Sequence, residues 1–315
     1  MEALASPCSD CDAYCCCYLP LQVVPARSLM EIDFIRYALN FPRVEAGLTI
    51  GGQWSLYYVM PCRLFDRDTR GCTVHGTELQ PKTCSAYNEH DCWYQRATRD
   101  DAAGFLRLDR TRLARLLAVL TFDRDRSLTA APDWSEMVEL CRATPMAYSW
   151  ESVLAGEGEP APHPLPLQEA VPSQERTLAE VLDDPCTRCA APCCRYLLFP
   201  LPLPRDFMQL DYVRFCLGFP GVEVLATPTA WSLLLRADCT HFDGERLRCT
   251  AFGSPERPLR CLHLNQWQCD PYRQLLQAGA PLQRLTHDSF AVAMAQARFD
   301  DHGGLVAWPG LPAAV

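Results

Sequence analysis

Cysteine is the residue type in this sequence with the clearest capacity for chemistry, because one eight-cysteine pattern occurs twice. Cys186 repeats the position of Cys8, and Cys239 repeats that of Cys62 after a single-residue deletion, so nearly every gap recurs. Thiolates bind soft metal ions and also act as nucleophiles and redox groups. Sixteen of the 19 cysteines belong to the two copies: Cys8, Cys11, Cys15, Cys16, Cys62, Cys72, Cys84 and Cys92, then Cys186, Cys189, Cys193, Cys194, Cys239, Cys249, Cys261 and Cys269.

The spacing within each copy is typical of a metal site. Both copies read C-x2-C-x3-C-C and then C-x9-C-x11-C-x7-C. A C-x2-C loop can turn two sulfurs toward one ion, as at structural zinc and iron–sulfur centres. Eight thiols permit two four-coordinate sites, or one site beside redox or unligated cysteines. We therefore expect all sixteen repeated cysteines to be metal ligands, with zinc and an iron–sulfur cluster as the open alternatives.

Other residues near this pattern have weaker claims to bind metal. None of the 7 histidines recurs between the copies, and His75, beside Cys72, is interpreted as a turn residue. In an extended chain the side chains of Cys15 and Cys16 would face opposite sides, so we expect one sulfur of each adjacent pair to serve another site or none. The cysteines outside the pattern are interpreted as buried packing residues: Cys17, Cys141 and Cys216.

Composition limits the classes of protein to which the chain can belong. It has 315 residues, 49% hydrophobic composition and a net charge of −9, which does not fit general nucleic-acid binding. It contains no stretch of transmembrane length, and residues 1–12 lack the features of a signal peptide. We expect a cytoplasmic protein with no membrane or nucleic-acid partner. In a reducing cytosol, patterned thiols indicate metal binding or catalysis more than disulfides.

The repeat predicts an α+β fold with two tandem homologous, small, cysteine-rich domains organised by metal. We expect module 1 over residues 1–125, a linker rich in proline and glutamate over 126–178, module 2 over 179–301 and a tail over 302–315. Hydrophobic periodicity predicts a helix and then a β-hairpin in each module, followed by a second helix. The expected elements are helices at 29–40, near 207–217, at 111–121 and at 288–297, with strands at 54–59 and 231–235.

Several non-cysteine residues also recur, and most have ordinary structural interpretations. Asp33 and Arg36 have helical spacing and predict a solvent-side ion pair. Asp66 is expected to cap a turn, and Trp54 is expected to anchor the core or the hairpin. Glu45 is a minor candidate for a general base. The second copies of these residues are Asp211, Arg214, Asp243, Trp231 and Glu223, and Ser28 is the expected N-cap of the helix that begins at residue 29.

Two segments of module 2 resemble a known family. The run Cys239-Thr-His-Phe-Asp-Gly-Glu-Arg-Leu-Arg-Cys249, followed by Arg257-Pro-Leu-Arg-Cys261, is similar to motifs of the YkgJ-type cysteine-cluster proteins. Module 1 is more divergent, with Gln80-Pro-Lys-Thr-Cys84 in the second segment. Both modules have one residue more before the double cysteine than the common C-x2-C-x2-C-C opening. This three-residue gap resembles the flagellin lysine N-methylase branch.

The resemblance implies a zinc- or iron-chelating domain, present here as a tandem duplication. Its methylase branch also implies an alternative, an iron–sulfur-dependent enzyme that uses S-adenosylmethionine to modify lysines. The sequence contains no strand followed by a G-x-G-x-x-G turn and no C-x3-C-x2-C motif, so it leaves enzymatic activity undecided. A metal-handling adaptor with a protein client is the third hypothesis. Under all three, the expected primary partner is a metal ion or cluster.

Overall fold

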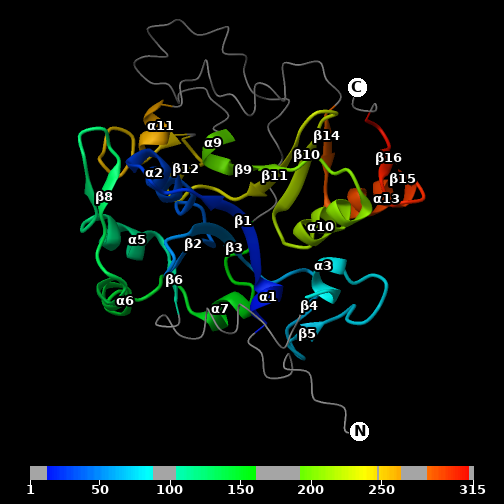
Figure 1. Ribbon diagram of the computed structural model, residues 1–315, viewed down its shortest axis with the longest axis horizontal. Coiled ribbons are helices and arrows are strands. Elements are labelled where there is room, and N and C mark those ends of the chain that lie inside the picture. The colour runs from blue at the N-terminus through cyan, green and yellow to red at the C-terminus, as the bar shows by residue number, and fades with distance from the viewer. Residues whose placement is uncertain (1–12, 88–103, 161–191, 247, 264–281, 312–315) are drawn as a thin grey trace, which may run out of the picture. The chain divides into compact units, whose positions relative to one another are not determined.

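The computed structural model describes residues 13–87, 104–160, 192–246, 248–263 and 282–311. The chain divides into two compact units (Figure 1). Unit 1 comprises Met1–Leu39, Arg43–Glu159 and Gly218–Pro220, and unit 2 comprises Asn40–Pro42, Pro160–Leu217 and Gly221–Val315. Both contain helices and antiparallel sheets, which confirms the α+β class.

Unit 1 is built on a four-stranded antiparallel sheet with the order β1-β3-β2-β6. A single helical turn precedes β1, and short hairpins and helices follow the main strands. In chain order the elements are α1 (Tyr14–Cys17), β1 (Tyr18–Val24), α2 (Leu29–Ala38), β2 (Val44–Thr49), β3 (Trp54–Val59), β4 (Phe65–Asp66), β5 (Gly71–Cys72), α3 (Lys82–Ser85), β6 (Phe105–Leu108), α5 (Arg110–Leu117), β7 (Thr121–Phe122), β8 (Leu128–Ala130), α6 (Trp134–Arg142) and α7 (Trp150–Leu154).

Unit 2 repeats this plan, with a sheet ordered β9-β11-β10-β14. Each of its strands and helices aligns with an element of unit 1 at the spacing of the cysteine repeat. Its elements are α9 (Pro192–Arg195), β9 (Tyr196–Leu201), α10 (Phe207–Leu217), β10 (Val222–Ala226), β11 (Trp231–Arg236), β12 (Phe242–Asp243), β13 (Arg248–Cys249), α11 (Leu259–His263), β14 (Gln283–Leu285), α13 (His287–Gln296), β15 (Arg298–Phe299) and β16 (Leu305–Ala307).

Local sequence signals explain where the first long helix of each unit begins. The Ser28 hydroxyl accepts a hydrogen bond from the Glu31 backbone, and the Glu31 carboxylate accepts one from the Arg27 backbone. This reciprocal capping satisfies N–H groups that have no partner within the helix. In unit 2 the Asp206 carboxylate caps the backbone of Gln209 in the same way. The predicted cap at Ser28 is therefore confirmed.

The hairpin strands lie where the alternation of apolar and polar residues and the content of β-branched or aromatic residues predicted them. β3 spans Trp54–Val59 as expected, and β11 extends one residue beyond the prediction, to Arg236. Both strands are central in their sheets, so Trp54 and Trp231 are buried, at 6% and 3% exposure. This confirms their interpretation as core anchors. Gly52 has a positive φ of 78°, consistent with the turn predicted at Gly51-Gly52.

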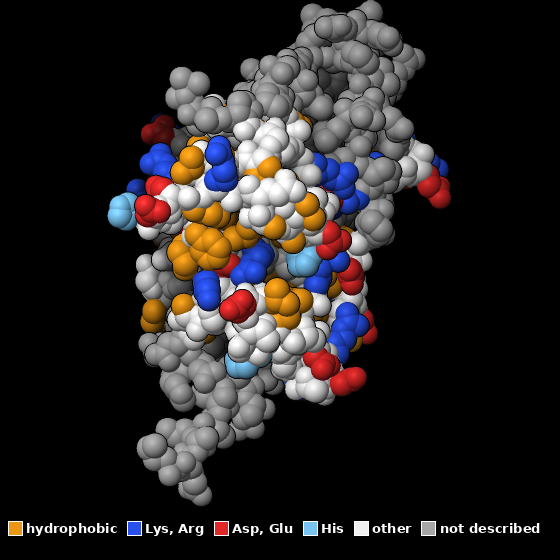
Figure 2. Space-filling model, turned by 90° about the vertical axis from the view of Figure 1, so that its right-hand side faces the viewer, with side chains coloured by type: hydrophobic (Ala, Val, Ile, Leu, Met, Phe, Trp, Pro, Cys, Tyr) orange, Lys and Arg blue, Asp and Glu red, His pale blue; other side chains and the backbone are white. Residues whose placement is uncertain are grey.

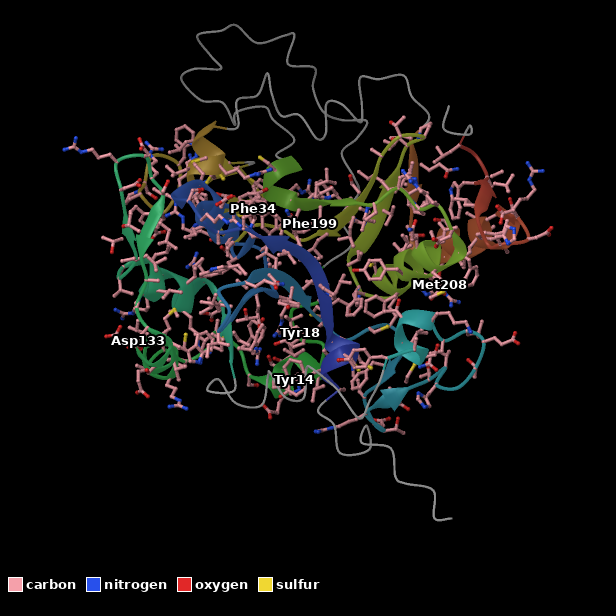
Figure 3. The ribbon with its side chains drawn as sticks, viewed as in Figure 1. Tyr14, Tyr18, Phe34, Asp133, Phe199 and Met208 are labelled. Atoms are coloured by element: carbon pink, nitrogen blue, oxygen red, sulfur yellow. The ribbon has the colours of Figure 1, made fainter. Side chains whose placement is uncertain are left out.

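The core of unit 1 includes residues that composition had placed in the linker. Val153 of α7 is fully buried, and Trp150 stacks on Tyr18 with ring centroids 5.6 Å apart. Tyr14 and Tyr18, at the junction of α1 and β1, take part in the same aromatic cluster (Figure 3). Residues up to Glu159 belong to unit 1. Residues 126–159 therefore belong to unit 1 and not to a linker, because a few aromatic residues suffice to dock a short helix.

Candidate metal centres

The adjacent cysteines of each unit occupy a single helical turn directly before the first strand. Cys15 and Cys16 lie in α1, and Cys193 and Cys194 lie in α9. Successive side chains on a helix are about 100° apart, unlike the opposed side chains of a strand. In each turn the two thiols interact through a side-chain hydrogen bond. The expectation that the pair would face opposite sides is wrong, because the backbone is helical there.

A backbone hydrogen bond joins the next cysteine of the pattern to this turn. The N–H of Cys62 donates to the carbonyl oxygen of Cys16 at 2.7 Å, and the N–H of Cys239 donates to that of Cys194 at 2.6 Å. The carbonyl of Cys62 in turn accepts from Phe65, which begins β4. Cysteines that are far apart in sequence are thereby held beside each other by main-chain contacts present in both units.

A minimal hairpin places the following cysteine. Cys72 of β5 pairs with Phe65 of β4, and Cys249 of β13 pairs with Phe242 of β12. The Asp66 carboxylate caps the turn by accepting from the backbone N–H groups of Asp68 and Thr69. Asp243 caps the turn of unit 2 in the same manner. These carboxylates are therefore turn caps, as predicted.

The remaining described cysteines of the pattern lie in short helices that start after a proline. The N–H of Cys84 in α3 donates to the Pro81 carbonyl at 2.9 Å, and the N–H of Cys261 in α11 donates to the Pro258 carbonyl at 3.0 Å. In unit 2 the guanidinium of Arg257 donates to the Cys261 carbonyl at 2.8 Å. This hydrogen bond from Arg257 stabilises the turn that carries Cys261.

The electrostatics of the thiols show which cysteines lie near one another. The pKa of Cys62 is raised to about 11, chiefly by burial and in smaller part by nearby Cys72 and Cys15. The pKa of Cys16 is raised most by its hydrogen bond with Cys15. Burial and the nearby thiols of Cys17 and Cys62 raise it further. Thiols so close together resist losing several protons unless a cation compensates the charge.

Unit 2 has the same clustering. Burial raises the pKa of Cys261, and Cys193, Cys239 and Cys249 raise it further. Cys193 of a helical turn, Cys239 of a loop and Cys249 of a hairpin therefore lie within electrostatic reach of Cys261. Their side chains offer only sulfur atoms as possible donors, a set that would suit a thiophilic metal such as zinc or iron.

The described residues include ten of the sixteen predicted ligands. Six of the predicted ligands lie outside the described residues: Cys8, Cys11, Cys92, Cys186, Cys189 and Cys269. Among the residues that the structure does describe, no three Cys, His, Asp or Glu side chains are arranged to hold one ion. His75 is an exposed turn residue whose N–H donates to the Cys72 carbonyl. The cysteines outside the repeat are buried, as expected: Cys17, Cys141 and Cys216.

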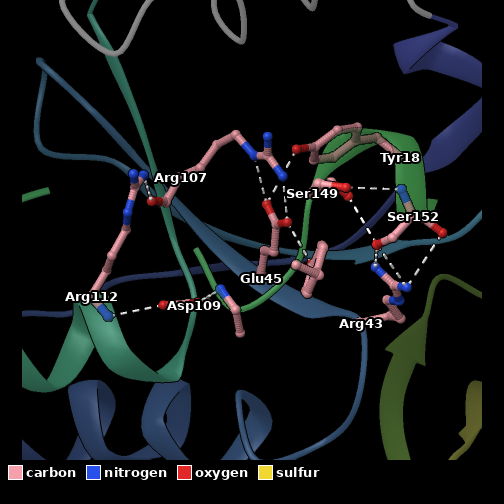
Figure 4. A network of polar contacts seen from close by, with 10 residues as sticks. Tyr18, Arg43, Glu45, Arg107, Asp109, Arg112, Ser149 and Ser152 are labelled. Atoms are coloured by element: carbon pink, nitrogen blue, oxygen red, sulfur yellow. Dashed lines mark hydrogen bonds and ion pairs between the residues drawn. The ribbon is translucent and has the colours of Figure 1, made fainter. Parts of the chain in front are cut away.

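A buried polar network lies behind the cysteine turn of unit 1. The Glu45 carboxylate, 1% exposed, accepts from Nε and Nη2 of Arg107 at 2.9 and 2.6 Å. It also accepts from the hydroxyls of Tyr18 at 3.2 Å and Tyr148 at 2.5 Å (Figure 4). Tyr18 is the first residue of β1 and follows Cys17 directly. The network therefore fixes the strand that continues from the double-cysteine turn.

Unit 2 keeps the acidic and basic members of this network. Glu223 accepts from Arg284 at 2.5 and 2.7 Å and from Nη1 of Arg236 at 2.6 Å. Burial raises the pKa of Tyr196, whereas the charges of Arg236 and Arg284 lower it, so the tyrosine lies within reach of both cations. Glu45 and Glu223 are thus buried ion-pair residues, and neither lies in an open cleft as a free base would.

The arginine partners of Glu45 and Glu223 were not predicted from the sequence. Arg107 and Arg284 are separated by the same offset as Cys62 and Cys239, so the repeat itself carried the signal. No local pattern links Glu45 to Arg107, because the pair joins β2 to β6, two strands that are distant in sequence.

The repeated Asp–Arg pairs also differ from expectation. Asp33 and Asp211 are 3% and 0% exposed, whereas Arg36 and Arg214 are 27% and 23% exposed. The pairs exist at i,i+3 spacing, but the prediction of a solvent-side pair is wrong for the carboxylates. α2 and α10 bury the face that carries aspartate, and the longer arginine side chains reach outward from it.

Comparison of the chain with protein-family models, curated proteins and solved structures finds no match. The likeness to YkgJ-type proteins therefore remains a prediction from the motifs. Among the described helices, none is long and apolar enough to span a membrane.

Proposed function

We propose that each unit is a metal-binding module in which the repeated cysteines hold zinc or an iron–sulfur centre. The observation that carries the proposal is the recurrence of the same cysteine arrangement in both units. In each, the double-cysteine turn is hydrogen-bonded to the next cysteine, with a cysteine hairpin following it. An arrangement needed only for packing would not require thiols at every one of these positions, since other small apolar residues pack equally well.

The clustered thiols further support a cation at each centre. Burial and neighbouring sulfurs raise the pKa values of Cys62 and Cys261, so without a metal these two thiols favour the protonated form. A bound metal would displace these protons and release them to solvent. The cysteines not described by the structure, including Cys11 and Cys189 of the C-x2-C loops, would complete the ligand set.

The test is the metal and acid-labile sulfide content of anaerobically purified protein, measured with its visible absorption spectrum. Colourless protein with roughly two to four zinc ions per chain, one or two per module, supports structural zinc sites. Iron with matching sulfide and thiolate-to-iron absorption supports a cluster and leads to a binding test with S-adenosylmethionine. A chain that contains neither metal above background when purified from metal-replete cells refutes the proposal.

Matched variants assign the metal to the repeat. Cys62→Ser and Cys239→Ser should each lower the metal content of one unit while the other unit keeps its share. Cys141→Ala is the control, because Cys141 is buried in α6 and lies outside the repeat. Equal metal loss in this control and in the two serine variants would contradict the assignment.

A further inference from the structure

Residues 148–158 include α7 and form a segment, here termed the strap, that packs against the double-cysteine turn of unit 1. The Trp150 ring lies on Tyr14 of α1, with ring centroids 4.4 Å apart, and α7 lies beside α1 in Figure 1. Val153 is fully buried in the same apolar cluster. Burial of these side chains removes apolar surface from water and holds the strap against α1.

Arg43, directly before β2, is the main polar anchor of the strap. Apolar contact has no direction, and hydrophobic side chains also reach the surface on the face that Figure 2 shows. The buried Arg43 guanidinium adds direction, because it donates to the Ser152 hydroxyl at 3.2 Å (Figure 4). Its Nε donates to the Glu157 carbonyl at 2.9 Å, and the guanidinium lies 4.2 Å from the centroid of the Tyr148 ring. One side chain thus contacts the strap near both of its ends.

Arg43 holds a backbone conformation that favours glycine. Its φ is 61°, which brings steric strain to any residue that carries a Cβ. In unit 2 the residue after the repeated Phe-Pro is Gly221, whose φ is 74° and whose missing Cβ avoids this strain. The contacts of the Arg43 guanidinium with the strap offset the strain that glycine would not have.

The strap also contacts the hairpin that carries Cys72. Gly156, which follows α7, has a φ of 69°, and a Cβ on it would overlap Nη2 of Arg67. Arg67 lies in the turn between β4 and β5. The absence of a Cβ therefore lets the Arg67 side chain lie against the backbone of the strap. Two cysteine-bearing elements of unit 1, α1 and the β4–β5 hairpin, are both in contact with this one segment.

We propose that the strap positions the cysteines of unit 1 for metal binding and that Arg43 is the residue that fastens it. A docked strap restrains α1 and the β4–β5 hairpin together, so their thiols are held ready for the metal. Groups that orient metal ligands from behind commonly change metal affinity by about 10–100-fold when they are removed. The inference rests on the proposed function, because it concerns the centre that these cysteines would form.

Arg43→Gly is the variant that releases the strap. It removes the guanidinium and relieves the backbone strain at the same position. In a Cys239→Ser background, which leaves the centre of unit 1 to be observed, transfer of metal to a chromophoric chelator should become at least about tenfold faster. In a Cys62→Ser background, where unit 2 is observed, the same substitution should leave the transfer rate unchanged.

Two further measurements separate positioning from general stability. Val138→Ala opens a cavity under α6, outside the strap, and should lower the melting temperature without faster metal release. Coupling is reciprocal, so metal should in turn favour the docked strap. Amide hydrogen exchange of residues 148–158 in the unmodified chain should therefore be slower with metal bound than after chelation.

Each outcome decides a different claim. A metal-loaded chain whose release rate is unchanged by Arg43→Gly, or is raised equally by Val138→Ala, overturns the strap proposal but agrees with the proposed function. Strap amides that exchange equally with and without metal also overturn it. A chain that binds no metal overturns both proposals. Gly156→Ala, which disturbs the contact with Arg67, is the second variant if Arg43→Gly does not fold.

Discussion

Nη2 of Arg107 lies 2.6 Å from Oε1 of Glu45, in a pair where the two side chains are only 14% and 1% exposed. The pair joins neighbouring strands β2 and β6, and Glu223 with Arg284 joins β10 and β14 in unit 2. Two hydrogen bonds from one guanidinium to one carboxylate fix both position and angle. This relationship therefore holds the edge strands β6 and β14 in register with β2 and β10.

Removing the charge of Glu45 should destabilise unit 1 strongly. Glu45→Gln keeps the shape but leaves Arg107 buried without its counter-charge, and broken buried pairs cost about 3–5 kcal/mol. Urea unfolding should show this loss in the free energy of unfolding. The control is Glu139→Gln, whose pair with Arg142 is 73% and 51% exposed and should contribute less than about 1 kcal/mol. Equal effects of the two substitutions would contradict the role of the buried pair.

The same carboxylate predicts a specific acid sensitivity. Burial alone raises the pKa of Glu45, but the Arg107 charge and hydrogen bonds from Arg107, Tyr148 and Tyr18 outweigh it, and the net pKa lies below its usual 4.5. A depressed pKa in the folded state stabilises the protein above the unfolded value, and this contribution is lost as pH falls through the folded pKa.

The difference in unfolding free energy between the unmodified chain and Glu45→Gln should therefore be constant above about pH 5 and shrink at lower pH. Unfolding curves at several pH values on either side of the usual glutamate pKa would measure it. Because both proteins carry the same cysteines and other acids, their titration cancels in the difference. A difference that grows as pH falls would contradict the depressed pKa.

Gly47→Ala should destabilise the sheet of unit 1. A Cβ at this position would overlap Cζ of Phe105 and lie 2.8 Å from Cε2 of Tyr57, and both rings are buried. Overpacking of this kind costs about 1–3 kcal/mol. Gly51→Ala is the control, because its Cβ would meet only Thr49 Oγ1 at 3.7 Å. Thermal melts should separate the two variants, and equal melting temperatures would refute the close packing at Gly47.

Removal of the metal should lower stability under the proposed function. A ligand that binds only the folded state at a thousand times its dissociation constant adds about 4 kcal/mol. Calorimetry before and after treatment with a strong chelator should show a lower melting temperature, which returns when the metal is restored. The sheets should keep their far-ultraviolet circular dichroism, because the core of unit 2 contains none of the repeated cysteines. An unchanged melting temperature after verified metal loss would exclude a structural metal.

Features set by neighbouring residues could be predicted well from the sequence. The strand at Trp54–Val59 and the cap at Ser28 depend on a few adjacent positions, and so do the turn caps at Asp66 and Asp243. The duplication could also be read directly, because equal spacing of cysteines requires no knowledge of the fold. It indicated that two similar units would occur.

Contacts between distant residues were decided by the tertiary structure alone. The hydrogen bond that joins Cys62 to Cys16, the burial of Asp33 and the docking of Trp150 on Tyr18 each depend on how separate elements pack. Periodicity reports which residues share a face of one element, but not which other element covers that face. The sequence by itself thus determined the repeat and its local elements, whereas only packing determined the buried Glu45–Arg107 pair, because that pair joins strands that are distant in the sequence.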